Sequence, residues 1–274
     1  MVVPIQIDDP DDPRLADYAS LKDAGLRADE GAGRRGVFNT EGEVIVRILA
    51  ESRFPMRSVL MTPNRVAGLA DVLEKMPGTA AAYMVSDAVM QRLVGFQFHR
   101  GVLGCGERIA GPGFEEVAGA SRALVVLEGL TNAENVGAAF RNTAALAGAG
   151  SAVLLSPSCC DPFYRKAVRV SMGHVLRVPF ARVEPWPGGL GTLRELGFTV
   201  IALTPDPGAR DIRTIEPGEV ARPALVLGTE GAGLSEGAFG EAGLRVRIPI
   251  SAGVDSLNIS VACGVALSRL VEPR

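Results

Sequence analysis

Five short apolar segments in the second half of the chain, separated by stretches of helical periodicity, constrain the fold most strongly. The segments are ALVVL (123–127), AVLLS (152–156), TVIALT (199–204), PALVLGT (223–229) and RVRIPI (245–250). Helical patterns separate most of them or follow the last, over 137–147, 161–172, 190–196 and 256–272. Continuous apolar strands that alternate with helices are typical of a parallel sheet covered on both faces. We therefore predict an α/β domain over 122–274.

Residues 41–110 repeat this alternation on a smaller scale, which a chain of 274 residues has room for as a second domain. Helical patterns lie at 41–52, 64–76 and 87–95, and strand patterns lie at 58–62, 81–86 and 100–107. In the first helix we expect Val44, Ile48 and Leu49 to face inward. The glycine- and proline-containing stretch 111–121 is expected to be a linker.

Residues 1–40 are expected to form a loose, polar arm with one helix near Leu15 and Tyr18. The arm contains GAGRRG (31–36), which matches the GxGxxG pattern. A dinucleotide site needs a buried strand before that pattern and a helix after it, and neither is predicted here. The pattern is therefore interpreted as a loop.

The net charge of −3 comes mainly from this arm. Residues 1–30 hold three basic and eight acidic side chains, whereas residues 31–112 hold ten basic and seven acidic ones. Nearly all the basic residues are arginine, which can grip a phosphate with two donors. Genome composition explains the arginine excess equally well.

The chain shows no export signal, no apolar run of membrane length and no paired cysteine motif. We expect a cytoplasmic protein with no bound metal. The four cysteines are interpreted as reduced structural thiols, with redox sensitivity of the adjacent Cys159 and Cys160 as the alternative.

Three polar loops follow predicted strands, at the edge of a parallel sheet where ligands bind. In the loop 132–141, a helix start and Arg141 could hold an anion, although an Asn-capped helix with a surface arginine also fits. The Gly-rich loop 227–235 carries Glu230 and could present backbone groups to a ligand, or be a plain strand-to-helix turn. In 248–262, Asp255 or Ser256 could cap the last helix. Such capping does not explain why the polar Asn258 stands in an otherwise apolar element.

Together, in this order and spacing, the three loops resemble the motifs of the SpoU (TrmH-like) family of RNA 2′-O-methyltransferases, within the SPOUT class. The resemblance covers about 123–272 and extends to DPFYRKAVRVSMG (161–173). Residues 41–110 look like the ribosomal-protein-like RNA-binding domain that precedes many such enzymes, notably at FNTEGEV (38–44) and His99-Arg-Gly101. Arg100 stands where the family often has glutamine, and the stretch after Arg141 is about two residues longer than usual.

The resemblance implies a domain with a deep trefoil knot, a homodimer formed through it, and S-adenosylmethionine as the methyl donor. The residues that match the family's cofactor-binding positions are Leu203, Thr204, Gly228, Ile248 and Leu257. Arg141 matches the catalytic arginine, and the polar residues that accompany it are Asn135, Glu230, Ser256 and Asn258.

The reaction implied is methylation of a ribose 2′-hydroxyl in RNA. A guanidinium with a pKa above about 12 hardly takes up a proton, so we assign Arg141 to hold the phosphate and the developing alkoxide, with Glu230 tuning it. Asn135 and Arg141 are expected to serve the cofactor of the partner chain. The terminal helix, apolar around Val261, Val265 and Leu267, is the expected dimer interface.

The domain at 41–110 is expected to bind the RNA backbone in a salt-sensitive manner. The candidate contacts, each of which could also be an ordinary surface charge, are Arg53, Arg57, Arg65, Arg92 and Arg100. The sequence leaves ribosomal and transfer RNA open, with a slight preference for ribosomal RNA. Two alternatives to the methyltransferase are a non-catalytic RNA-binding protein with the same fold and a nucleotide enzyme. Cofactor binding separates these three possibilities, because the first binds S-adenosylmethionine, the second binds no cofactor and the third binds NAD or ATP.

Overall fold

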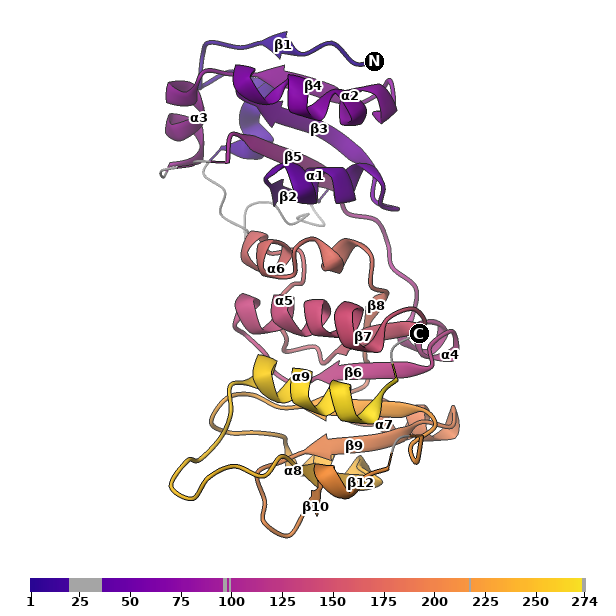
Figure 1. Cartoon of the computed structure of the whole chain (residues 1–274). Coiled ribbons are helices and arrows are strands. Elements are labelled where there is room, and N and C mark those ends of the chain that lie inside the picture. The colour runs from indigo at the N-terminus through magenta and orange to yellow at the C-terminus, as the bar shows by residue number, and fades with distance from the viewer. Residues whose placement is uncertain (20–35, 96–97, 99, 217, 273–274) are drawn as a thin grey trace. The chain divides into compact units, whose positions relative to one another are not determined.

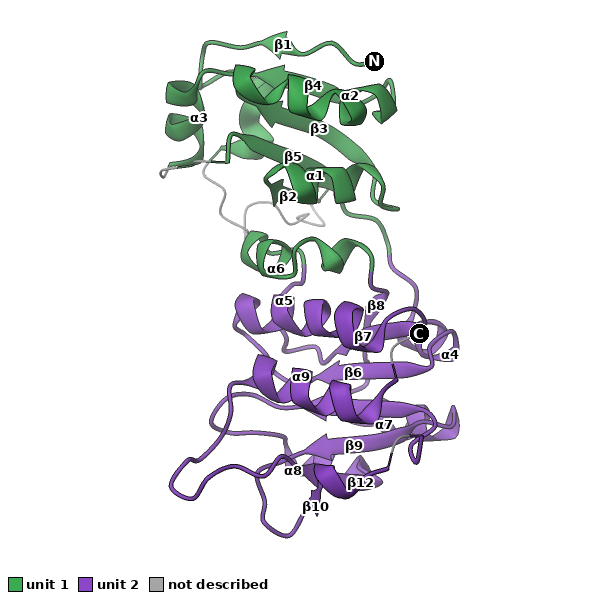
Figure 2. Cartoon of the chain, in the orientation of Figure 1, with its two compact units in different colours: residues 1–110, 163–177 green, residues 111–162, 178–274 purple. Residues whose placement is uncertain are grey.

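The computed structural model describes residues 1–19, 36–95, 98, 100–216 and 218–272 (Figure 1). They form two compact units, shown in Figure 2. Unit 1 comprises residues 1–110 and 163–177, and unit 2 comprises residues 111–162 and 178–274. No helix among the described residues is long and apolar enough to cross a membrane.

Unit 1 contains, within the described residues, a five-stranded sheet in the order β1-β4-β3-β5-β2. The β1–β4 and β3–β4 pairs are parallel, and β3–β5 and β2–β5 are antiparallel. The strands are β1 (Ile5–Gln6), β2 (Val37–Glu41), β3 (Met56–Met61), β4 (Ala81–Met84) and β5 (Val102–Glu107). The helices are α1 (Glu43–Ala50), α2 (Ala70–Lys75), α3 (Asp87–Val94) and α6 (Arg165–Val170). Short 3₁₀ turns lie at Pro13–Tyr18, Pro63–Arg65, Ala67–Leu69 and His174–Leu176.

Two details of the predicted small domain are wrong. Val44, expected to face inward, is 57% exposed, because α1 buries Ile45, Val46, Ile48 and Leu49 instead. The expected helix over 64–76 consists of two 3₁₀ turns followed by the short α2. A helix register cannot be read reliably when four of five neighbouring residues are apolar.

The N-terminal residues are more integrated than a loose arm. β1 pairs with β4, and Leu15 and Tyr18 are fully buried in the core of unit 1. The Tyr18 hydroxyl lies 2.7 Å from Ser58 Oγ on β3. Most of the GAGRRG pattern lies outside the described residues.

Residues 163–177 belong to unit 1, although the sequence places them inside the predicted C-terminal domain. The Phe163 ring stacks on Phe38 of β2, with centroids 4.6 Å apart and an angle of 20°. Arg165 on α6 pairs with the buried Glu41 at 2.9 Å. The helical pattern at 161–172 therefore corresponds to a short α6 that packs on β2.

Unit 2 contains, in the part of the chain that the structure describes, a seven-stranded parallel sheet in the order β10-β12-β9-β11-β6-β7-β8. This confirms the predicted parallel α/β domain. The strands are β6 (Ala123–Leu127), β7 (Ser151–Leu155), β8 (Phe180–Arg182), β9 (Thr199–Leu203), β10 (Arg210–Asp211), β11 (Pro223–Leu227) and β12 (Leu244–Arg247). The helices are α4 (Phe114–Gly119), α5 (Ala133–Asn142), α7 (Gly189–Glu195), α8 (Glu236–Glu241) and α9 (Ile259–Leu270). A π-helical turn, Thr143–Ala147, extends α5, and a 3₁₀ turn lies at Ile212–Thr214.

Helices cover the sheet of unit 2, and β6, β7 and β11 are buried throughout. One face packs on α4, α7 and α8 through a single apolar cluster. On the other, α5 and α9 lie side by side (Figure 1), joined where Asn142 Nδ2 donates to the Ser260 carbonyl at 2.7 Å. The expected linker 111–121 therefore includes α4, which contributes Val117 and Ala118 to the core.

Candidate cofactor site and catalytic residues

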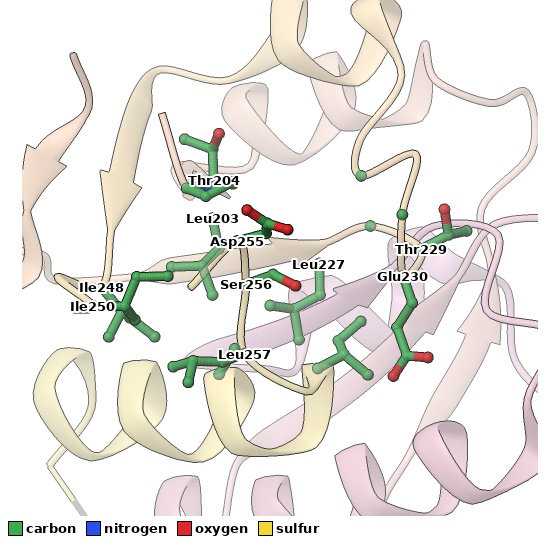
Figure 3. Close-up of a pocket in the computed structure, with 16 residues that line it drawn as sticks. Leu203, Thr204, Leu227, Thr229, Glu230, Ile248, Ile250, Asp255, Ser256 and Leu257 are labelled. Atoms are coloured by element: carbon green, nitrogen blue, oxygen red, sulfur yellow. The ribbon is translucent and has the colours of Figure 1, made fainter. Parts of the chain in front are cut away.

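A cavity of about 500 Å³ lies in unit 2, where the carboxyl ends of β9, β11 and β12 meet the start of α9 (Figure 3). Its lining includes all five of the predicted cofactor residues, namely Leu203, Thr204, Gly228, Ile248 and Leu257. Leu227 and Ile250 add apolar walls, and Asp255 adds a carboxylate. The position agrees with the rule that ligands bind at the carboxyl ends of parallel strands.

Gly228 begins the loop that forms one wall of this cavity. A Cβ at this position would lie 2.3 Å from the backbone carbon and oxygen of Gly233 and 2.5 Å from the backbone nitrogen of Leu234. Thr229 and Gly233 close the loop with two backbone hydrogen bonds of 3.1 and 3.0 Å. Gly231 and Gly233 have positive φ angles of 88° and 71°, which explains the glycines in this stretch.

Glu230 connects all three predicted loops. Its Oε1 accepts hydrogen bonds from Nδ2 of Asn135 and from Nδ2 of Asn258, both at 3.0 Å. Asn135 comes from the first turn of α5 and Asn258 from the residue before α9. Figure 3 shows Glu230 at one side of the residues that line the cavity. The structure thus brings together three of the predicted catalytic residues.

Asn258, rather than Asp255 or Ser256, caps α9. Its Oδ1 accepts from the backbone nitrogen of Ser260 at 2.9 Å and from Ser260 Oγ at 2.6 Å. The expected capping by Asp255 or Ser256 is therefore wrong, and both residues line the cavity instead. The Asn258 side-chain amide accepts hydrogen bonds at the start of α9 with its oxygen and donates one to Glu230 with its nitrogen. Because asparagine carries both an acceptor and a donor, this accounts for an asparagine at position 258.

Arg141 lies on α5 but away from this group. It is exposed, and it makes no hydrogen bond or ion pair with the residues that the structure describes. At about 100° per residue, the six positions from Asn135 to Arg141 rotate the side chain to a different face of the helix. The Arg141 guanidinium is therefore unpaired, within the described part of the chain, on the exposed face of α5.

The five arginines predicted to contact RNA all belong to unit 1. Arg57, Arg65 and Arg92 pair with Asp17, Glu43 and Asp11 at 3.2, 3.1 and 3.3 Å. The Arg53 guanidinium carbon lies 4.9 Å from the centre of the Phe54 ring, and Arg100 Nη1 donates to the Glu41 carbonyl at 3.3 Å. Ion pairs this exposed contribute at most about 1 kcal/mol, so a phosphate could replace the carboxylates. His99 lies outside the described residues.

Sequence reasoning missed Glu128, Trp186 and Ser235. Glu128 follows β6, is buried, and accepts hydrogen bonds from both other residues. A carboxylate directly after a buried strand was the available signal. Its partners lie 58 and 107 residues further along the chain and could not have been identified.

The four cysteines carry thiols and are not joined in disulfides, and Cys160 is the one among them that is only partly buried. Burial raises the pKa of the Cys263 thiol to about 12 and raises that of Cys105 further. Both thiols are protonated at neutral pH. Among the residues that the structure describes, no group of three or more His, Cys, Asp or Glu is placed to hold a metal ion.

Comparison with known proteins agrees with this geometry. Residues 122–268 match the model of the SpoU rRNA Methylase family. This chain belongs to the SpoU family. A protein of Mycobacterium tuberculosis named as an uncharacterized tRNA/rRNA methyltransferase is 42% identical over 260 residues, which cover 94% of this chain and 88% of that protein. A 23S rRNA (guanosine-2′-O-)-methyltransferase of Vibrio cholerae is 32% identical over 151 residues, covering 55% of this chain and 59% of that enzyme.

Solved methyltransferase structures share the fold. An rRNA methyltransferase from Sinorhizobium meliloti with bound AdoMet superposes with a TM-score of 0.78 at 24% identity, covering 96% of this chain and 95% of that one. The SpoU methyltransferase AviRb from Streptomyces viridochromogenes, in complex with AdoMet, gives a TM-score of 0.77 at 20% identity, with coverage of 94% and 97%. The fold of this SpoU protein is thus shared with these two methyltransferase structures.

Proposed function

We propose that this chain transfers a methyl group from S-adenosylmethionine to a ribose 2′-hydroxyl of structured RNA, with ribosomal RNA preferred to transfer RNA. As a SpoU family member it is an RNA methyltransferase that uses S-adenosylmethionine. The assignment of the 2′-oxygen and of ribosomal RNA is supported by the Vibrio cholerae relative, whose name specifies both. The observation that carries the proposal is the convergence of Asn135, Glu230 and Asn258 beside the cavity.

The cavity fits this cofactor. Its volume of about 500 Å³ lies in the range of sites for ligands of this size. Leu203, Ile248 and Leu257 offer apolar surfaces for a purine ring, and the absence of a side chain at Gly228 leaves backbone groups of the loop within reach of a ligand. We assign Leu203, Thr204, Gly228, Ile248 and Leu257 to hold it.

The chemistry needs an oxygen placed in line with the bond that breaks. When bound, S-adenosylmethionine would supply a methyl group on a positively charged sulfur. The 2′-oxygen would bond to the methyl carbon as the carbon–sulfur bond breaks, the sulfur would leave as a neutral thioether, and the hydroxyl proton would pass to water. Positioning supplies much of the rate of such a reaction. We assign the Arg141 guanidinium to the neighbouring phosphate and to the charge that develops on the 2′-oxygen, since it hardly accepts a proton. Glu230 and Ser256 line the cavity, where they would orient the ribose.

The homodimer and the deep trefoil knot belong to this proposal. On α9, Val261 and Val265 are 51% and 39% exposed, and Val254 before it is 50% exposed. A second copy of this chain would cover these apolar side chains. In that dimer Arg141 would serve the partner's cofactor. Asn135, which we expected to do the same, bonds Glu230 of its own chain and is now assigned to its own site.

The RNA-binding role of residues 41–110 is also part of the proposal. The five arginines named above would hold the backbone of the RNA, and their exposed ion pairs would be exchanged for phosphates. Affinity for RNA should therefore fall steeply between low and moderate salt. An affinity that does not change with salt would contradict this role.

The test is the transfer of labelled methyl groups to unmodified ribosomal and transfer RNA, followed by alkaline hydrolysis. Because 2′-O-methylation blocks cleavage, label in an alkali-resistant dinucleotide supports the proposal and identifies the RNA class. Label recovered in mononucleotides would show base methylation and refute it. Arg141→Ala should lower the rate about 100-fold, and Arg141→Lys should recover only part of this loss. A rate within a few-fold of wild type for Arg141→Ala would refute the assigned role.

A further inference from the structure

We propose that Glu128 is a positioning residue for cofactor binding, because it anchors the far end of the loop 228–235. This inference rests on the proposed cofactor site. Glu128 does not line the cavity, so its effect would pass through the loop. It lies at the carboxyl end of β6, next to β11, from which the loop emerges.

Glu128 is 8% exposed, and both of its carboxylate oxygens accept hydrogen bonds. Oε1 accepts from the Trp186 indole nitrogen and from Ser235 Oγ, both at 2.7 Å. Oε2 accepts from the backbone nitrogen of Ser235 at 2.9 Å. Hydrogen bonds to a charged acceptor in a buried site are among the stronger ones in proteins.

Ser235 transmits this anchoring to the cavity wall. It follows Leu234, whose backbone nitrogen would lie 2.5 Å from a Cβ at position 228. Ser235 Oγ also caps α8 by accepting from the Ala238 nitrogen at 3.2 Å. The loop is thus held at one end by β11 and at the other by Glu128, while the Thr229–Gly233 bridge keeps its middle closed. Loss of the Glu128 anchor would let Gly228 and Glu230 move relative to Leu203 and Leu257.

A carboxylate is required because three donors converge on it. A glutamine at position 128 has one oxygen and one NH2 group. If the oxygen faces the Ser235 nitrogen, the NH2 group opposes the indole N–H of Trp186. If the amide is turned round, it opposes the Ser235 N–H. Glu128→Gln therefore breaks one bond in either orientation, and removing the indole donor relieves the conflict.

The experiment measures S-adenosylmethionine affinity by titration calorimetry for Glu128→Gln, Trp186→Phe and the double variant of the full chain. Glu128→Gln should weaken binding about tenfold, the usual effect of one lost hydrogen bond to a charged group. Trp186→Phe should stay within about threefold of wild type, and the double variant should return to the level of Trp186→Phe. Glu195→Gln, an exposed carboxylate on α7, is the control and should not change binding.

Two further readouts separate positioning from general destabilisation. In steady-state kinetics Glu128→Gln should raise KM for S-adenosylmethionine while leaving KM for RNA and kcat at saturation within about twofold. The fluorescence of Trp186, the chain's single tryptophan, should shift in Glu128→Gln, because the indole loses its charged acceptor. A merely destabilised protein would lose kcat, and the double variant would be worse than either single one.

The proposal is overturned if Glu128→Gln binds S-adenosylmethionine within twofold of wild type. It is also overturned if adding Trp186→Phe to Glu128→Gln does not restore binding in the double variant. These binding measurements do not depend on which RNA atom is methylated. Failure of 2′-O-methylation by the wild-type protein would overturn the proposed function alone. Normal methylation with unchanged binding by Glu128→Gln would overturn the positioning role alone.

Discussion

Asn135 and Glu230 are 95 positions apart in the sequence, yet the Asn135 amide nitrogen lies 3.0 Å from Glu230 Oε1. The Asn258 amide donates to the same oxygen. A glutamine at 230 could keep its oxygen there and turn its NH2 group outward. Glu230→Gln should therefore bind S-adenosylmethionine within about threefold of wild type but transfer methyl groups at least about tenfold more slowly, because only the charge is lost. Equal rates in a single-turnover assay would show that this charge has no role.

Substitutions at Asn258 separate its hydrogen bonds with Ser260 from its hydrogen bond with Glu230. Asn258→Asp keeps an oxygen that can cap α9 but replaces the donor to Glu230 by a second negative charge. Asn258→Ala removes all three hydrogen bonds. We expect Asn258→Ala to lower the free energy of unfolding by about 0.5–2 kcal/mol in urea titrations, as for other lost caps. Asn258→Asp should lower it less and still impair methyl transfer. Full activity of Asn258→Asp would contradict a role for the Glu230 contact.

Gly228 should not tolerate a side chain. Because the added Cβ would meet backbone atoms at 2.3–2.5 Å, Gly228→Ala should destabilise the fold by about 1–3 kcal/mol and abolish measurable cofactor binding. Gly240→Ala on α8 is the matched control, since a Cβ there has no neighbour within 4 Å. It should leave binding unchanged and stabilise slightly, as alanine favours a helix. Thermal unfolding measures the stability of both variants, and titration calorimetry measures their cofactor binding. Normal binding by Gly228→Ala would contradict the prediction, because it would show that the loop can move to make room for the added Cβ.

The exposed valines of α9 test the proposed dimer. The double variant Val261→Lys, Val265→Lys places charge in the proposed apolar interface. Its sedimentation coefficient at micromolar concentration should therefore shift toward that of the monomer. Val44→Lys on α1 of unit 1, where the valine is 57% exposed, is the control and should remain dimeric. A wild-type monomer, or a dimer that survives both lysines, would exclude this interface.

The cysteines should differ sharply in reactivity. At pH 8 a thiolate-selective reagent should label Cys160 in the folded protein and the remaining three cysteines only after unfolding, because these are buried. The pKa of Cys263 is raised from about 9 to about 12 by burial, so the folded state binds this proton more tightly. The corresponding stability is complete below about pH 9 and is lost as the pH rises toward 12. Rapid labelling of Cys263 in the folded protein would contradict this.

The sequence by itself determined five of the seven strands in the described part of unit 2, and it missed the short β8 and β10. Segments such as 123–127 and 223–227 are apolar throughout, and this local property is enough to predict buried parallel strands. Parallel strands place their carboxyl ends at one edge, which is enough to predict that the loops after them lie together, whereas Gly228 and Ile248 were singled out by the resemblance to the family. The family motifs added Asn135, Glu230 and Asn258.

Only the tertiary structure decided features that depend on partners distant in the chain. Residues 163–177 pack on β2 of unit 1 because Phe163 meets Phe38 and Arg165 meets Glu41. Glu128 is a buried carboxylate because Trp186 and Ser235 supply donors from two other segments. Hydrogen bonds and ring contacts require atoms to meet in space, and the periodicity of a sequence reports which face of an element is buried, not which side chain it meets there.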